Sequence, residues 1–92
     1  MKSENLYRHK FVVRCPNDNA QILYELEITT EDGRVIMVED IIAWANGLPG
    51  ALHHEVIADS AYQTFGGRQT MWATHKGVEI RTDRYPEEPD AA

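Results

Sequence analysis

The single cysteine of the chain, Cys15, is the residue whose type most directly offers chemistry. It stands in the segment Arg14-Cys15-Pro16-Asn17-Asp18, where an alternating stretch breaks into a tight loop. A lone thiol cannot form an internal disulfide, so its use lies in packing or in reactivity. As a thiolate, which a neighbouring positive charge such as Arg14 and loop amides favour, it is a soft nucleophile. The other interpretation, a small buried hydrophobic residue, stays open at this point.

Several carboxylates and histidines are further candidates. Glu55, beside His54, has two oxygens that match two adjacent N–H donors of a guanine-like edge, although an exposed helix position explains it equally well. Asp18 follows the cysteine by three residues and is by type a turn former. Glu39 is by type a carboxylate in the first turn of a helix, where it interacts with the helix dipole.

The histidines do not predict a metal site. His53 and His54 are adjacent and therefore point in different directions on a helix, and His75 is expected in a turn. We therefore expect no bound metal. The segment Gly66-Gly67-Arg68 lacks the context of a phosphate loop, and a β-bulge with a surface arginine is the better interpretation.

Hydrophobic periodicity indicates the elements that position these residues. Two-residue alternation predicts strands over 7–15 and 22–29, joined by a short loop. A three-to-four-residue period predicts a helix from Glu39, with acids in its first turn and with Gly47 and Pro49 at its end. Residues 35–38 form either a short strand or an extended segment leading into that helix.

In the second half of the chain we expect a helix first and then two strands. We expect a second helix over 51–60, an extended segment at 62–65, a bend or bulge at 66–67 and a strand over 69–73. A hairpin turn at 74–77 then leads into a strand over 78–82. Two hairpins on either side of two helices predict an α+β domain, an antiparallel sheet with the helices on one face.

Length and charge restrict the classes of protein. Ninety-two residues describe one domain, which we place at 1–83, followed by an acidic, mobile tail at 84–92. A net charge of −6 argues against nucleic acid as the main partner. The sequence contains no apolar segment long enough to predict a membrane span and no recognisable signal-peptide pattern, so we expect a cytoplasmic protein. A single free cysteine agrees with a reducing compartment, and so small a core gains from oligomerisation.

Three short motifs resemble one known family. Cys15-Pro16 follows the first strand, Val38-Glu39 opens the first helix, and His54-Glu55 follows it. In this respect the chain is similar to the tunnelling-fold enzymes, whose small ββααββ subunits assemble into rings and bind purine or pterin bases between subunits. The resemblance is greatest to the 7-cyano-7-deazaguanine (preQ0) reductases of queuosine synthesis and their amidinotransferase relatives.

The resemblance implies a role for each matching residue. Cys15 corresponds to the nucleophile that attacks the substrate nitrile to form a thioimide, and Asp18 to an aspartate that serves as proton donor or base. Glu55, with His54 beside it, corresponds to the glutamate that binds the guanine-like edge, and Glu39 belongs to the same substrate-binding set. The ligand would be a planar purine-like or pterin-like base, held in a homo-oligomeric ring.

The chain also departs from that family. The reductases bind NADPH through a lysine-rich motif after Val-Glu, whereas residues 40–45 here contain no lysine. The zinc-binding relatives need a second cysteine or a set of histidines that this chain does not supply. NADPH is therefore a possible cofactor, but the lysine-rich motif that binds it in the reductases is absent. No other cofactor is expected.

Two functions of different classes follow. The first is an enzyme or former enzyme that acts on a 7-deazaguanine-type or pterin-type base through Cys15. The second is a small acidic protein without catalysis that docks on a basic surface of a larger protein, which the negative charge and the missing lysines favour.

Overall fold

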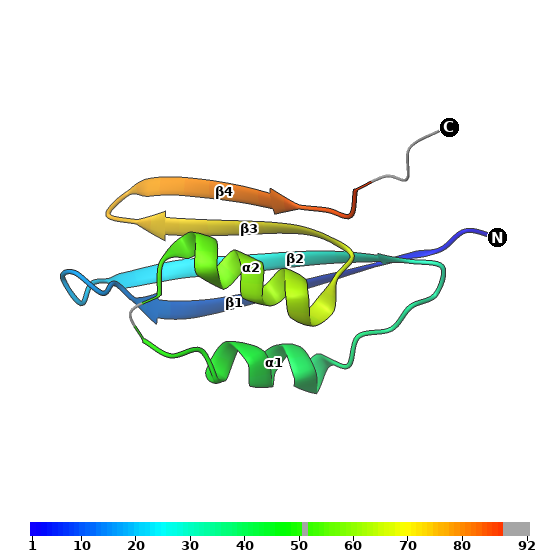
Figure 1. Cartoon of the computed structure of the whole chain (residues 1–92), viewed down its shortest axis with the longest axis horizontal. Helices are drawn as coiled ribbons and strands as arrows, with labels where there is room; N and C mark the ends of the chain where they lie inside the picture. Colours follow the sequence, from blue (N-terminus) through cyan, green and yellow to red (C-terminus); the bar gives the residue numbers. More distant parts are fainter. Residues whose placement is uncertain (51, 88–92) are drawn as a thin grey trace.

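The computed structural model describes residues 1–50 and 52–87 and has four strands and two helices (Figure 1). In chain order they are β1 (Glu4–Arg14), β2 (Gln21–Glu31), α1 (Val38–Asn46), α2 (His54–Phe65), β3 (Arg68–His75) and β4 (Val78–Arg84). This order confirms the α+β class and the ββααββ plan.

The strands form one antiparallel sheet in the order β1-β2-β3-β4. Arg14 pairs with Gln21, and His75 pairs with Val78, so the β1–β2 loop and the β3–β4 turn lie at the same end of the sheet (Figure 1). The β3–β4 turn consists of Lys76 and Gly77, both with positive φ, which suits the right-handed twist of a hairpin. His75 is thus the last residue of β3, and the prediction that it lies in the turn is wrong.

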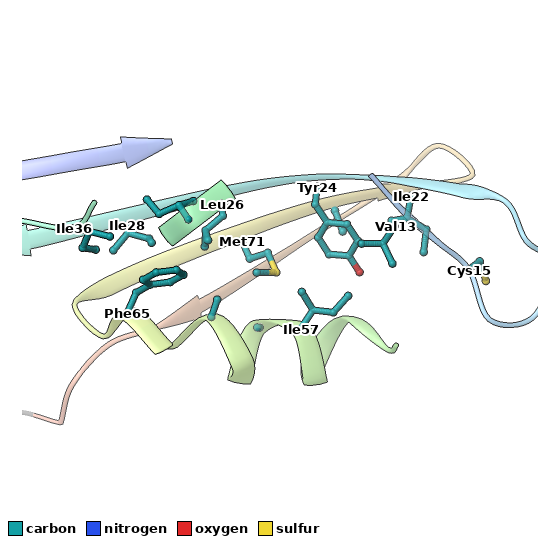
Figure 2. Close-up of a cluster of buried hydrophobic side chains, with 14 residues drawn as sticks. Val13, Cys15, Ile22, Tyr24, Leu26, Ile28, Ile36, Ile57, Phe65 and Met71 are labelled. Atoms are coloured by element: carbon teal, nitrogen blue, oxygen red, sulfur yellow. The ribbon is translucent and has the colours of Figure 1, made fainter. Parts of the chain in front are cut away.

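One face of the sheet carries the core. Every second residue of β2 points inward, and Leu26 and Ile28 are at most 1% exposed. Against them pack Ile57 of α2 and Met71 of β3, which are equally buried (Figure 2). The two helices cover this face because each presents apolar residues at helical spacing.

Helix α2 extends further than predicted. The segment 62–65 was expected to be extended, but it forms the last turn of α2. Ala58, Ala61 and Phe65 are all buried at a spacing of three to four residues, so the helix buries one continuous stripe against the sheet. That packing outweighs the strand preference of the aromatic and β-branched residues in the segment.

The two glycines after α2 form a connection rather than a β-bulge. Gly66 ends the helix and Gly67 precedes β3, each with positive φ. A Cβ on Gly67 would lie 2.6 Å from the carbonyl oxygen of Thr29, closer than two non-bonded atoms can approach. Glycine is therefore required where the chain passes β2 on its way into β3.

The segment before α1 is an extended lead-in and forms no strand. Ile36 is buried, and its backbone N–H donates to the hydroxyl of Tyr7 on β1 at 3.1 Å. This bond ties the connection to the sheet edge at the point where α1 begins.

Arg84, assigned to the tail from the sequence, is the last residue of β4 and pairs with Gln69. Residues 85–87 follow it without secondary structure and are exposed, while positions 88–92 of the expected tail lie outside the described residues. Neither described helix is long and apolar enough to cross a membrane.

Candidate functional site

Cys15 lies just beyond β1 at the margin of the core. Its side chain is 7% exposed, and Figure 2 shows it at one end of the buried cluster, beyond Val13. Its backbone N–H donates to the carbonyl of Ala20 at 2.8 Å, and its carbonyl accepts from the N–H of Asn19 at 3.0 Å. The thiol is therefore held by a closed loop whose backbone is bonded on both sides.

A carboxylate and an imidazole meet the thiol at this point. The ligand-type atoms of Cys15, Asp18 and His75 all lie within 4.8 Å of one another. Cys15 and Asp18 come from the β1–β2 loop, and His75 comes from the end of β3. Their meeting follows from the sheet register, which brings both connections to the same end.

Asp18 is held in place by a cation and an amide. The ammonium group of Lys76 forms an ion pair with its carboxylate, and the backbone N–H of Ala20 donates to it at 3.0 Å. The hydrogen bond from Lys76, followed by those from Ala20 and Cys15, holds the pKa of Asp18 well below its usual range. Asp18 is thus an ionised acceptor.

His75 is the functional candidate that sequence reasoning missed. Its Nε2 atom is buried and has no hydrogen-bond partner within the described part of the chain. A buried ring nitrogen without a partner is costly unless something is bound there or a proton is exchanged. The sequence signal that could have revealed His75 is a two-residue hairpin turn at Lys76-Gly77, because such a turn places the preceding residue at the end of a strand.

A pocket of about 220 Å³ opens beside the cysteine. Its walls include Cys15 and Tyr24 from the sheet side, with His53 and His54 from the start of α2. Ile80 of β4 forms part of the rim and is 40% exposed. The pocket is smaller than most ligand sites, which measure about 300 to 1,000 Å³, and it is open on one side.

His54 is fixed at the back of this pocket. Its Nε2 is hydrogen-bonded to the hydroxyl of Thr82, and its ring stacks on Tyr24 with centroids 5.7 Å apart. Its Nδ1 is buried without a partner among the described residues. Burial lowers the pKa of His54 and raises that of Tyr24, so both side chains favour their neutral forms.

Two of the predicted substrate-binding carboxylates lie elsewhere. Glu55 forms an ion pair with Arg84, which also contacts Asp59 at 3.2 Å, and it does not line the pocket. Its side chain is 71% exposed. Glu39 is exposed in the first turn of α1, which agrees with a role at the helix dipole. Within one chain, Cys15 lies beside Asp18 in the cluster and lines the pocket together with His54, whereas Glu55 and Glu39 belong to neither.

A larger hollow of about 640 Å³ lies on the face of the sheet that the helices leave open. Three of its charged side chains interact with one another: Arg8 bonds Glu25 and lies 3.7 Å from Glu27. The guanidinium of Arg81 lies 5.3 Å from the ring centre of Trp72, which also lines this hollow. We locate the candidate chemistry at the smaller pocket, because it holds the thiol and, within the described part of the chain, the larger hollow has no buried side-chain polar atom without a partner.

The cluster also has the composition of a metal site. A thiol, an imidazole and a carboxylate are all metal-ligating groups. The prediction of no metal site considered only His53, His54 and His75 together, and the structure instead combines His75 with Cys15 and Asp18.

Comparison of the chain with protein-family models, with curated proteins and with solved structures gave no match.

Proposed function

We propose that this protein is a tunnelling-fold enzyme that acts on a 7-deazaguanine-type base carrying a nitrile, such as preQ0, or on a related pterin-type base, with Cys15 as nucleophile. The observation that carries the proposal is the meeting of the Cys15 thiol, the Asp18 carboxylate and the His75 imidazole beside an aromatic pocket. The ββααββ plan and the Cys15-Pro16 motif support it.

The proposed chemistry is addition of the thiol to the nitrile. The sulfur of Cys15 bonds to the nitrile carbon, the thiol proton leaves to a ring nitrogen of His75, and the nitrile nitrogen takes up a proton. The product is a covalent thioimide and nothing is expelled. The ion pair with Lys76 keeps the Asp18 carboxylate an acceptor, so it orients the thiol or the imidazole, and His75 takes the role of proton carrier.

The base would stack against the side chains of the pocket. Tyr24 and His54 already form a stacked pair, and the unpartnered Nδ1 of His54 can exchange a hydrogen bond with the edge of a planar heterocycle. Glu55 and Glu39 stay in the proposal only as residues that another subunit could bring to the base.

A second copy of the chain would complete the pocket. Val56, Val78 and Ile80 are apolar and at least 40% exposed, and Ile80 lies on the open rim. Strands β1 and β4 are the sheet edges and offer unpaired backbone groups. A ring of subunits would cover both features and enclose the base.

The proposal does not require NADPH. Thioimide formation needs no reductant, and the chain lacks the lysines of the reductase motif at 40–45. It includes a cytoplasmic location, because a nucleophilic thiol has to be kept reduced.

Intact mass after incubation with preQ0 tests the proposal. The native protein should gain the mass of the whole substrate, because the addition expels nothing, and Cys15→Ala should gain nothing. No other cysteine can react with the substrate, because Cys15 is the only cysteine in the sequence. Two results together would refute a nucleophilic role for Cys15: the mass of the native protein does not change with preQ0, and iodoacetamide does not react with the thiol until the protein is unfolded.

The second candidate function, docking on a basic partner, is supported by a separate surface. Glu31 is the last residue of β2, Asp32 follows it in a turn, Glu39 and Asp40 lie in the first turn of α1, and all four are exposed. In the described part of the chain none of them forms an ion pair, in contrast to Asp18 and Glu25. Reversing the charges of Glu31, Asp32 and Asp40, none of which belongs to the proposed base site, should abolish capture of a basic partner and leave formation of the preQ0 adduct unchanged.

A further inference from the structure

The side chains around Cys15 are three different kinds of metal ligand, two from the β1–β2 loop and one from the end of β3. The sulfur of Cys15, a carboxylate oxygen of Asp18 and a ring nitrogen of His75 lie within 4.8 Å of one another. Among the described residues this is the one such group. A second observation points to a ligand: Nε2 of His75 is buried and has no hydrogen-bond partner among the described residues.

The mixture of donors selects the metal. Thiolate and imidazole favour zinc over magnesium and calcium, which prefer oxygen ligands alone. Three protein ligands with one open position is the arrangement of zinc sites that exchange ligands. Bonds of about 2.0 to 2.3 Å would draw the donors together, which the exposed turn position of Asp18 permits.

The surrounding bonds already orient two of the ligands. The N–H of Ala20 donates to Asp18 at 3.0 Å, and the backbone of Cys15 is bonded to both Ala20 and Asn19. Such outer contacts hold first ligands in place and add to metal affinity.

Lys76 competes with a cation for the same carboxylate. Its ammonium forms an ion pair with Asp18, and its side chain is 66% exposed, so it can move into solvent. A zinc ion would replace it without leaving net charge behind, because the thiolate and the carboxylate together balance the two charges of the ion.

We infer that Cys15, Asp18 and His75 bind a zinc ion, and that bound zinc blocks the thiol as a nucleophile. The first half of this inference stands on the cluster alone, and the second half rests on the proposed function. Zinc would thus act as a reversible inhibitor of the site: binding releases the thiol proton and engages the sulfur lone pair that would otherwise attack the nitrile.

Titration of the reduced full-length protein with cobalt(II), a spectroscopic substitute for zinc, tests the binding. We expect a charge-transfer band from thiolate to cobalt together with the strong visible bands of a four-coordinate ion, both abolished by added zinc. Cys15→Ser should remove the charge-transfer band, and His75→Ala and Asp18→Asn should weaken zinc binding at least about tenfold. Asp32→Asn, in an exposed turn, is the matched control and should bind like the native protein.

A variant of the competing lysine provides an independent check. Lys76→Met should strengthen zinc binding, because Asp18 loses its ion-pair partner, whereas Lys10→Met should not. No thiolate band in a protein that remains folded by circular dichroism, or equal affinity in the native protein and Asp18→Asn, would overturn the inference.

Adduct formation separates the two proposals. Zinc at saturation should prevent the preQ0 adduct, and a chelator should restore it. If zinc binds and no adduct forms even after chelation, the proposed function fails while the metal site stands. If the adduct forms equally with and without bound zinc, the blocking role of the metal fails while the function stands.

Discussion

The hydroxyl of Thr82 on β4 is hydrogen-bonded to Nε2 of His54, the first residue of α2. Since β4 is an edge strand, this contact joins the beginning of the helix to the margin of the sheet beside the pocket. It places the imidazole where burial opposes its protonation.

His54 should therefore titrate below a free imidazole. Burial lowers its pKa in the folded protein, so the neutral form is favoured and the contribution to stability is complete above the unfolded pKa of about 6.5. That contribution should be lost as the pH falls from about 6.5 through the lower folded value. An NMR titration, with the resonance assigned by comparison with His54→Gln, measures it, and a midpoint at or above 6.5 would contradict the prediction.

Ile57→Ala should strongly destabilise the fold. The side chain is completely buried between α2 and the sheet, and its truncation leaves a cavity that costs about 2 to 5 kcal/mol. The neighbouring Val56 is 48% exposed, so Val56→Ala should cost less than about 1 kcal/mol. Urea unfolding of both variants gives the comparison, and equal losses would show that the core is placed incorrectly.

Two glycines with the same backbone conformation separate strain from collision. Gly33 and Gly67 have φ of 74° and 72°, but only Gly67 has a neighbouring backbone atom where a Cβ would stand. Gly33→Ala should cost about 1 to 2 kcal/mol for the left-handed conformation. Gly67→Ala should cost at least about 1 kcal/mol more, because the chain at Thr29 has to move. Similar thermal denaturation midpoints for the two variants would argue against the close approach.

His75→Ala should slow formation of the preQ0 adduct under chelating conditions. If the imidazole carries the thiol proton, its loss should reduce the rate roughly a hundredfold. Lys10→Met, on the open face of the sheet, is the control and should react at the native rate. A native rate in His75→Ala would leave Cys15 as a nucleophile without this partner.

Ile80→Asp should dissociate the proposed ring. Ile80 is partly exposed at the open rim of the pocket, and a charge there would be buried by a second subunit at high cost. Val35→Asp changes an apolar residue of the connection before α1 and should leave assembly intact. Sedimentation equilibrium reports the molecular mass of both, and a native protein that sediments as a monomer at micromolar concentration would count against the ring itself.

The sheet was predictable from local pattern, whereas part of α2 was not. Along β2 the alternation of Tyr24, Leu26 and Ile28 with charged residues reflects one buried face, and the structure has that face. At 62–65 the local residues favour a strand, and only packing against distant β2 and β3 keeps them helical. The one local sign of the helix is the three-to-four-residue spacing of Ala58, Ala61 and Phe65, which the alternation at 62–65 obscures.

The candidate site was predictable in part. A proline after Cys15 and turn formers at Asn17 and Asp18 indicated a thiol at the end of a strand, and it is found there. The partnership with His75 depends on the register of strands far apart in sequence, which alternation does not determine. The direction of Glu55 was equally inaccessible, since its ion pair with Arg84 is a contact between α2 and β4.

The cluster at Cys15 is assembled from the β1–β2 loop and the end of β3, while the largest buried side chains lie along the strands and α2. Of its three members only Cys15 belongs to the buried core, so Asp18 and His75 are not needed to fill it. Substitutions at Asp18 and His75 can therefore change the ligand or substrate of the site while the buried core stays the same. The same ninety-two-residue scaffold can thus acquire other activities by mutation or by design.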